Sequence, residues 1–420
     1  MPNPRSTSVQ AAYPPLAMAL LAIVAVALTL RGPIVAITPV LGQVAADLGL
    51  GAGAAGLLGT LPVLAFAVCS PPAAVVIRKV GPEVAVVLTL TGIFVSQLVR
   101  AIPTPTTVFA GTMALGVAIT LGNIVVPVLI HRDVAPPRVA MVTGLYAAVL
   151  NVGSLATVLA TAPLANALGW PWALASWSAL AAAAGVICVL VQRRPATPAH
   201  PRASRTESTH PDGPTAAPAE VRASPSRPAL RIRATWLLSL AFTVQAFSYF
   251  GFTTWLPTYL SDATGSAPAA AGALAASFQA WGIAGGFLVP ALIRTIGLRG
   301  AALSVGLMWT SLSVGTLGAP GLIGMWLVLG GMAQSGGFIV IFSAVAVAAR
   351  DSREAAGMSA IVQACGYVVA TLSGPVIGAL RELSGGWQLP MTTLIGATVL
   401  FTLLATMATT HVHRAADYPA

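Results

Sequence analysis

Charged residues are scarce in this sequence. Only 8% of its 420 residues are Asp, Glu, Lys or Arg, whereas 56% are hydrophobic. So little charge is too little to cover the surface of a soluble globule of this size, which excludes a soluble enzyme or binding protein. Apolar runs long enough to cross a bilayer as helices, roughly 20 residues each, recur from end to end, which excludes a barrel of short alternating strands. The sequence predicts an all-α membrane protein.

Cysteine is also rare, with Cys69, Cys188 and Cys365 in three different apolar runs. They lack the spacing of a metal site and imply no disulfide, so we expect no metal and no cofactor. The net charge of +10 comes from basic residues in loops, which form no continuous basic face. This distribution argues against nucleic acid as a partner. The expected partners are a lipid bilayer and a small-molecule solute, and the expected state is a monomer.

Acidic side chains are absent from the interior of the apolar runs. All eleven Asp and Glu residues fall in loops, in the linker described below or in the tail, and the five histidines fall at run ends, in the linker or in the tail. Carriers that exchange protons for drugs usually hold a buried carboxylate or imidazole, so that mechanism is disfavoured. The apolar runs also lack a nucleophile or metal-ligand cluster, so we expect no enzyme.

The apolar runs divide the chain into twelve predicted transmembrane helices. They cover residues 16–38, 52–76, 83–102, 106–130, 139–162, 170–191, 234–260, 268–293, 299–318, 321–349, 356–380 and 388–410. Residues 192–233 between the sixth and seventh runs are rich in Pro, Ser, Ala and Arg, which predicts a flexible linker. We therefore expect an N-terminal six-helix bundle (1–191), a cytoplasmic linker (192–233) and a C-terminal six-helix bundle (234–420).

The basic residues orient these helices. Of the 21 lysines and arginines, only Arg100 and Arg381 lie on one side, at or near the ends of runs, and only Arg31 lies in the interior of a run. All the others lie on the opposite side, in the linker or in the tails. Because positively charged loops stay in the cytoplasm, the linker and both termini are predicted to be cytoplasmic. We expect the protein in a bacterial inner membrane.

The two halves resemble each other. "AGLLGTLPVLAFAVCSPPAAVVIRKVG" (55–81) and "AGALAASFQAWGIAGGFLVPALIRTIG" (271–297) share the leading Ala-Gly, the Ile-Arg and the final Gly. "GLYAAVLNVG" (144–153) aligns in the same way with "GMSAIVQACG" (357–366). Two six-helix repeats of the same topology, with a site between them at the middle of the bilayer, form the layout of the major facilitator transporters. Chance similarity between apolar segments is the alternative.

Arg31 is the predicted intramembrane charge. An arginine near the centre of a membrane helix costs about 2.5 to 3.5 kcal/mol on insertion scales, so something must offset it. Pro33 and Pro39 remove backbone donors, which predicts a kink with free carbonyls beside the guanidinium. A carbonyl, water or an anionic ligand is the expected partner, since the planar guanidinium suits a carboxylate-like group. The alternative is that Arg31 extends to the headgroups or braces the kink.

Other polar side chains fall at mid-depth in the predicted helices. Amides and phenols can orient a small polar solute while remaining neutral, although hydrogen bonding between helices is an equally ordinary use for them. Together with Arg31, the candidate solute-binding residues are Asn123, Asn151, Gln245, Tyr249, Gln279, Gln334, Gln363 and Tyr367. Gln245 and Tyr249 share one helix face at a spacing of four residues.

Several segments are similar to one family. "LTLRGPIVAITPVLGQVAADLGL", "AGLLGTLPVLAFAVCSPP", "GNIVVPVLI", "MVTGLYAAV" and "QAFSYFGFTTWLPTYL" together resemble the cyanate and 2-nitroimidazole transporter family of the major facilitator superfamily. The family pattern Asn-Leu-Arg in the first span reads Thr29-Leu30-Arg31 here. The resemblance implies an alternating-access carrier for a small polar or anionic solute, such as cyanate, a nitroimidazole or a small organic anion.

The same resemblance suggests gating positions. The superfamily loop Asp-Arg-x-Gly-Arg reads Arg78-Lys79-Val80-Gly81-Pro82 here, and its echo runs from Arg294 to Leu298. Because neither copy has the acidic residue, a salt-bridged gate of the usual kind is not expected. Gating or conformational roles are predicted for Pro33, Arg78, Gly81, Arg294 and Gly297. The alternative functions are a multidrug or metabolite exporter of the same superfamily and a non-transporting membrane sensor.

Overall fold

The computed structural model describes residues 16–192 and 229–417, and within these ranges it contains helices and no strands. The first half contains α1 (Leu16–Val35), α2 (Leu41–Leu48), α3 (Ala52–Val80), α4 (Pro82–Arg100), α5 (Pro105–Asp133), α6 (Pro136–Leu168), α7 (Trp170–Ser176) and α8 (Ser178–Gln192). The second contains α9 (Arg233–Thr264), α10 (Pro268–Gly318), α11 (Ile323–Ala348), α12 (Ser352–Ala370), α13 (Ser373–Ser384) and α14 (Gln388–Asp417). The all-α prediction is confirmed.

The long helices are apolar enough to cross a membrane. In the described residues, ten helical segments have the required length and composition. One of them is α10, whose 51 residues are two helices joined at Gly297; α9, with 32 residues, is not among the ten. The count of twelve spans stays a prediction, and most of the linker and the outermost residues of both termini lie outside the described residues.

Proline and short 3-10 turns interrupt the first predicted span. Helix α1 contains Pro33 and ends at Val35, and a 3-10 turn (Thr38–Val40) then leads into α2. Pro39 lies inside this turn, where its fixed φ is compatible with the backbone and its missing N–H costs little. The predicted kink is therefore a complete helix break, which leaves the last carbonyls of α1 without helical donors.

The backbone supports the internal similarity at two pairs of glycines. Gly81 has φ 83° and ψ 159°, and Gly297 has φ 73° and ψ 169°, values that suit glycine and turn the chain between helices in the same way. Gly153 of α6 packs on α1, where a Cβ would lie 2.7 Å from the Leu28 carbonyl oxygen. Gly366 of α12 packs on the equivalent helix, α9, where a Cβ would lie 2.2 Å from the ring of Phe242. Gly153 and Gly366 therefore allow close packing of equivalent helix pairs, α1 with α6 and α9 with α12.

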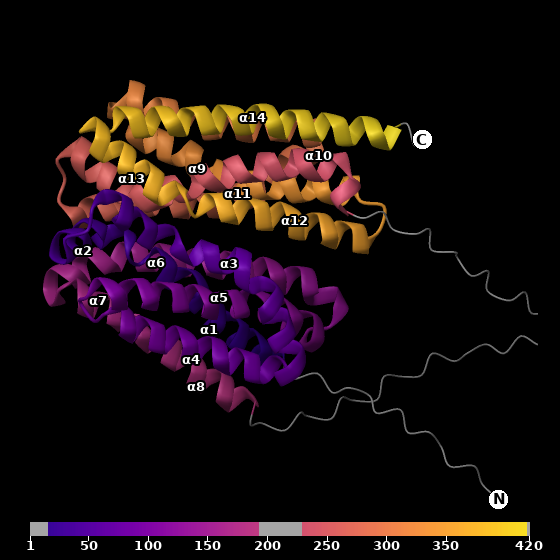
Figure 1. Ribbon diagram of the computed structural model, residues 1–420. Coiled ribbons are helices and arrows are strands. Elements are labelled where there is room, and N and C mark those ends of the chain that lie inside the picture. Colours follow the sequence, from indigo (N-terminus) through magenta and orange to yellow (C-terminus); the bar gives the residue numbers. More distant parts are fainter. Residues whose placement is uncertain (1–15, 193–228, 418–420) are drawn as a thin grey trace, which may run out of the picture.

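The two halves pack closely at one end of the molecule. Figure 1 shows the two bundles side by side, touching at the end with α2 and α13 and diverging toward the other. We call the touching end the outer end, since the basic residues predict that it faces away from the cytoplasm. There α3 meets α13 at backbone contact, because a Cβ on Gly56 would lie 2.1 Å from the Gly374 carbonyl oxygen.

Hydrogen bonds strengthen this outer contact. Thr60 donates to the Thr371 carbonyl at 2.6 Å, and the Ala52 backbone N–H donates to Glu382 at 2.5 Å. One apolar core runs through this contact, from Val40 and Leu58 of the first half to Trp255 of the second. A separate core, built from α1, α3–α6 and α8, fills the first half toward the inner end. The described structure is therefore sealed at the outer end.

Candidate functional site

Arg31 lies in the middle of the molecule and joins the two halves. Its Nη1 donates to Asn151 Oδ1 of α6 at 3.0 Å, and its Nη2 donates to the Tyr249 hydroxyl of α9 at 2.5 Å. Its Cζ lies 5.9 Å from the centroid of the Tyr249 ring. The side chain is half-buried, and no carboxylate of the described residues forms an ion pair with it. A permanent positive charge is thus held by two neutral side chains.

Close packing of α1 on α6 brings Asn151 to the guanidinium. Gly153 and Gly32 both lie at this contact, and a Cβ on Gly32 would overlap Thr157 at 2.4 Å. Asn151 is itself fixed, because its Nδ2 donates to the Ala147 carbonyl one turn earlier at 3.1 Å. The amide oxygen is therefore directed at Arg31 by the helix contact and by the local bond. The carbonyl, water or anionic ligand expected beside the guanidinium is thus joined by two side-chain partners, Asn151 and Tyr249, that were not expected as such.

Aromatic rings surround this centre. Tyr249 contacts Phe250 edge to face at 4.9 Å between centroids, and Phe250 continues to Tyr367 at 6.5 Å. Tyr367 also contacts Phe66 across the halves at 5.9 Å. Tyr146 and Tyr367 are close enough to Arg31 to interact with it electrostatically. The structure therefore brings together Arg31, Asn151, Tyr249 and Tyr367 of the predicted set and adds Tyr146, whose position in an apolar run gave no sequence signal.

The remaining predicted amides do not contact Arg31 through a hydrogen bond, and they lie in different environments. Gln245 Nε2 donates to the Gln334 carbonyl at 3.3 Å, and Gln334 Nε2 donates to the Phe278 carbonyl at 2.6 Å. These two side chains tie α9, α10 and α11 together, as the packing alternative anticipated. Gln363 Nε2 donates to Ser359 on its own helix at 3.4 Å, and Asn123 is exposed. Gln279 is buried, with Oε1 unpartnered.

Arg100 is a second arginine inside the helical bundle, although its position near the end of the run 83–102 predicts only a charge on the outer side. It is the last residue of α4, it is fully buried, and its Nη1 donates to the Pro33 carbonyl at 3.0 Å. That carbonyl lies where α1 breaks, so the guanidinium supplies a donor that the broken helix lacks. An arginine at the end of an apolar run is ambiguous in sequence. The contact with Pro33 depends on tertiary packing.

The predicted gating positions lie at the inner end and at the helix break. Arg78 and Arg294 are exposed in the last turns before Gly81 and Gly297. Pro33 takes part through its carbonyl oxygen. A basic residue beside a glycine turn is compatible with an inner surface that faces anionic headgroups. Their role in gating stays a prediction.

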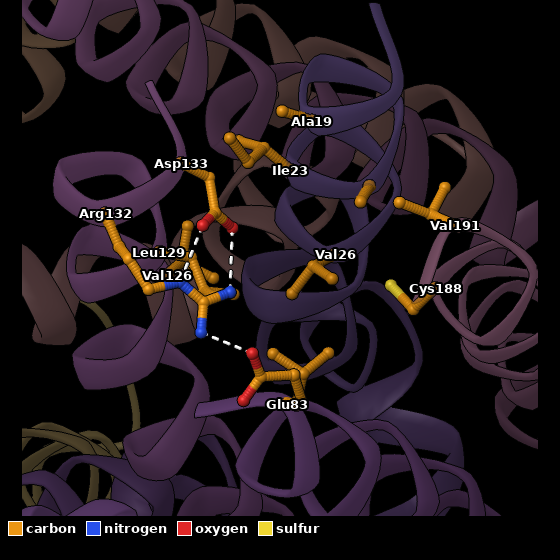
Figure 2. Close-up of a pocket in the computed structure, with 12 residues that line it drawn as sticks. Ala19, Ile23, Val26, Glu83, Val126, Leu129, Arg132, Asp133, Cys188 and Val191 are labelled. Atoms are coloured by element: carbon orange, nitrogen blue, oxygen red, sulfur yellow. Dashed lines mark hydrogen bonds and ion pairs between the residues drawn. The ribbon is translucent and has the colours of Figure 1, made fainter. Parts of the chain in front are cut away.

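A charged cluster also lies at the inner end of the first half. Figure 2 shows the Arg132 guanidinium between the carboxylates of Glu83 and Asp133, beside an apolar cavity of about 70 Å³. The bonds to Asp133 are 2.6 and 3.0 Å long. The hydrogen bond to Asp133, followed by that to Glu83, raises the pKa of Arg132 above its ordinary value.

This cluster modifies the expectation for the loop after the second span. The expected acid is missing from the loop itself, yet Glu83, two residues after Gly81, pairs with Arg132 and joins α4 to α5. A salt bridge therefore lies beside this loop, and both of its partners belong to the first half. The expected absence of a salt-bridged gate of the usual kind stays a prediction. Among residues 16–192 and 229–417, no three His, Cys, Asp or Glu side chains gather as metal ligands.

Comparisons with known proteins identify the family of this chain. The chain matches the Major Facilitator Superfamily over residues 16–326. It is 30% identical to the 2-nitroimidazole transporter of Escherichia coli (strain K12) over 385 residues. The aligned region covers 91% of this chain and 92% of the relative. It is 25% identical over 405 residues to the uncharacterized transporter YycB of Bacillus subtilis (strain 168), covering 95% and 94%. The resemblance seen in the sequence is confirmed.

Solved structures share the fold at low identity. A bacterial homolog of the human lysosomal transporter Spinster, in an inward-facing and occupied conformation, matches with a TM-score of 0.70 and 15% identity over 94% of this chain and 96% of that one. The nucleoside transporter NupG matches with a TM-score of 0.69 and 12% identity over 94% and 99%. On the match to the family and on these relatives, the chain belongs to the Major Facilitator Superfamily and is a membrane transporter, not an enzyme.

Proposed function

We propose that this protein carries a small polar or anionic solute across a bacterial inner membrane by alternating access. The candidate solutes are nitroimidazoles, cyanate and small organic anions. The observation that carries the proposal is the guanidinium of Arg31, half-buried at mid-depth between the halves, with two neutral partners and no carboxylate. The 2-nitroimidazole transporter among the relatives supports a solute with a planar pair of oxygens.

The chemistry of Arg31 fits such an oxygen pair. A guanidinium presents parallel N–H donors that match the two oxygens of a carboxylate or nitro group, and it remains charged throughout the physiological pH range. Asn151 and Tyr249 now occupy its two terminal nitrogens. A solute would replace one or both, and the displaced amide and phenol would serve as further hydrogen-bonding groups. Phe250 and Tyr367 would form the aromatic wall around the solute.

The membrane potential constrains the direction of transport. Importing one anion against an inside-negative potential of 100 mV costs about 2.3 kcal/mol, so import would need a steep gradient, exchange or a co-transported proton. Efflux of an anion would run downhill electrically, and a neutral nitroimidazole would be indifferent to the potential. Flux measured at imposed potentials and pH gradients separates these mechanisms.

Uptake into proteoliposomes tests the proposal. We expect wild-type protein to move radiolabelled 2-nitroimidazole or a small anion such as cyanate. Arg31→Ala should lower the flux at least about tenfold, because it removes a charge-assisted hydrogen-bonding group. Arg31→Lys should retain part of the flux, since it keeps the charge and loses the planar fork.

Folding must be checked in the same preparations. Both variants should elute as the wild type does in size-exclusion chromatography and melt within a few degrees of it. Equal flux in the wild type and in both Arg31 variants would remove Arg31 from the site. Absence of flux with every candidate solute would reject the proposed function.

A further inference from the structure

A small cavity lies between the halves on the outer side of Arg31. It measures about 10 Å³, enough for about one water molecule. Thr38 and Val158 line it from the first half, and Thr253, Phe278 and Gln279 line it from the second. Because both halves contribute to its walls, the size of this cavity must change whenever the halves rock against each other.

Two polar atoms in this lining have no hydrogen-bond partner. They are Gln279 Oε1 and Thr253 Oγ1, and both are shielded from solvent. The Gln279 side chain is only 3% exposed. A buried polar group without a partner costs free energy and calls for an explanation by water, strain or a ligand. The other buried unpartnered side-chain atoms in the described residues belong to Gln97, Arg100 and Ser154, outside this lining.

The cavity continues the Arg31 site by about one helical turn. Thr253 follows Tyr249 by four residues on α9, which corresponds to a rise of about 6 Å. On the first half, Thr38 lies beyond the break in α1 that follows Arg31. The Thr38 hydroxyl is already used, because it donates to the Val35 carbonyl at 2.9 Å. Gln279 and Thr253 are therefore the groups free to bind something here.

We propose that Gln279 and Thr253 form an outer subsite that accepts an N–H or O–H donor of the transported solute. This inference rests on the proposed function. The Gln279 oxygen can only accept, whereas the Thr253 hydroxyl can accept or donate. The preferred solute then has two features: an oxygen pair for Arg31 and a hydrogen-bond donor on its side facing Gln279 and Thr253. A nitroimidazole with a free ring N–H has both; cyanate has no donor and would reach Arg31 alone.

A pair of solutes that differ in one donor tests the subsite. Uptake of 2-nitroimidazole and 1-methyl-2-nitroimidazole would be compared in proteoliposomes, because methylation removes the ring N–H and keeps the nitro group. Wild-type protein should prefer 2-nitroimidazole by about tenfold in Vmax/KM, the effect of leaving a buried acceptor unpaired. Gln279→Leu should reduce this preference to less than about twofold, mainly by slowing 2-nitroimidazole.

Two further variants keep the test independent of one folding outcome. Thr253→Val removes the second group while keeping its shape, and it should lower the preference by a smaller factor. If Gln279→Leu does not reconstitute, Thr253→Val alone decides. Gln43→Leu removes a half-buried amide from α2, outside the cavity lining, and should discriminate as the wild type does.

The outcomes separate this inference from the proposed function. Transport of both compounds with equal efficiency by wild-type protein, with loss in Arg31→Ala, would overturn the subsite and leave the proposed function intact. An unchanged tenfold preference in both Gln279→Leu and Thr253→Val would also overturn it. If wild-type protein moved neither compound nor any small anion, both proposals would fail together.

Discussion

Arg31 and Arg100 are both arginines inside the helical bundle, and they differ in what surrounds their charge. Arg31 is half-buried and donates to side chains of α6 and α9, one from each half. Arg100 is fully buried and donates to a backbone carbonyl of its own half, while its Nε and Nη2 have no partner in the described residues. Side chains can move away from Arg31, but the Pro33 carbonyl is fixed by the chain.

The difference indicates separate roles for the two charges. Arg100 lies in the last turn of α4 and against the broken end of α1, and helix C-termini carry partial negative charge that stabilises a cation. In the described residues the hydrogen bonds of Arg31 go to side chains and not to a helix end. Arg100 therefore holds the helix break in place, whereas Arg31 is available to a solute. Four predictions test this comparison, beginning with the largest effect.

Arg100→Ala should destabilise the protein by about 2–5 kcal/mol. The substitution leaves a cavity in a packed region and an unpaired carbonyl at Pro33, and both terms act in the same direction. The free energy of unfolding of the purified protein, measured as the fraction of denaturing detergent in mixed micelles is raised, gives the loss. Arg31→Ala should change the unfolding free energy by less than about 1 kcal/mol, because its neighbours can be rehydrated. A larger loss for Arg31→Ala than for Arg100→Ala would contradict the assignment of roles.

Tyr249→Phe should lower solute flux by about tenfold, or about 1.4 kcal/mol, without lowering stability by a similar amount. The variant removes only the hydroxyl that accepts from Arg31 and keeps the ring in its contact with Phe250. Initial uptake rates and melting temperatures of the same preparations give both quantities. A loss of stability as large as the loss of flux would instead indicate a structural role for the Arg31–Tyr249 bond.

Arg100→Met should reduce flux about threefold while leaving stability within about 1 kcal/mol of the wild type. Methionine keeps most of the volume, and removal of a buried charge offsets the loss of the bond to Pro33. A small shift of α1 would then move Arg31, and binding groups tolerate such shifts poorly. The expected signature is a higher KM in uptake assays. Arg100→Lys, which keeps a donor, should restore part of the affinity.

Glu83→Gln should have the smallest effect, less than about 1 kcal/mol in stability. Arg132 is a third arginine for comparison, because it is solvent-exposed and already carries two carboxylate partners. Loss of one partner leaves the bonds to Asp133 in place. Thermal melting at low and high salt measures the change. An effect as large as that of Arg100→Ala would show that the Glu83–Arg132 pair stabilises the fold more than an exposed ion pair does.

Most of the fold was predictable because composition and charge patterns depend on the chain alone. The apolar runs, the glycine turns at Gly81 and Gly297 and the matching glycines Gly153 and Gly366 are visible in the sequence. They recur in the structure as helices, turns and helix contacts. The interruption between α1 and α2 was predicted as a kink from Pro33 and Pro39. The breaks within α7–α8 and α12–α13 were not predicted, because one apolar run can contain two helices without a change in hydropathy.

The site was predictable only in part, because an amide has the same appearance in a binding site and in a packing contact. Asn151 and Gln334 both fall at mid-depth, yet one holds Arg31 and the other bonds to the Phe278 carbonyl. The rotation of each helix and the identity of its neighbour decide the outcome. The unpartnered oxygen of Gln279 and the bond from Arg100 to Pro33 depend on those same tertiary details.

The bond from Arg31 to Tyr249 crosses from one half to the other at the position where a solute would bind. A solute that takes both terminal nitrogens of Arg31 must displace the tyrosine hydroxyl, and it thereby cuts a tether between the halves. Without solute, the carrier must break the Arg31–Tyr249 hydrogen bond before its halves can move apart, and the free energy of that bond adds to the barrier. With solute bound, the hydrogen bond is already broken. Solute binding would then lower the barrier to reorientation, and reorientation of the empty carrier would be slow.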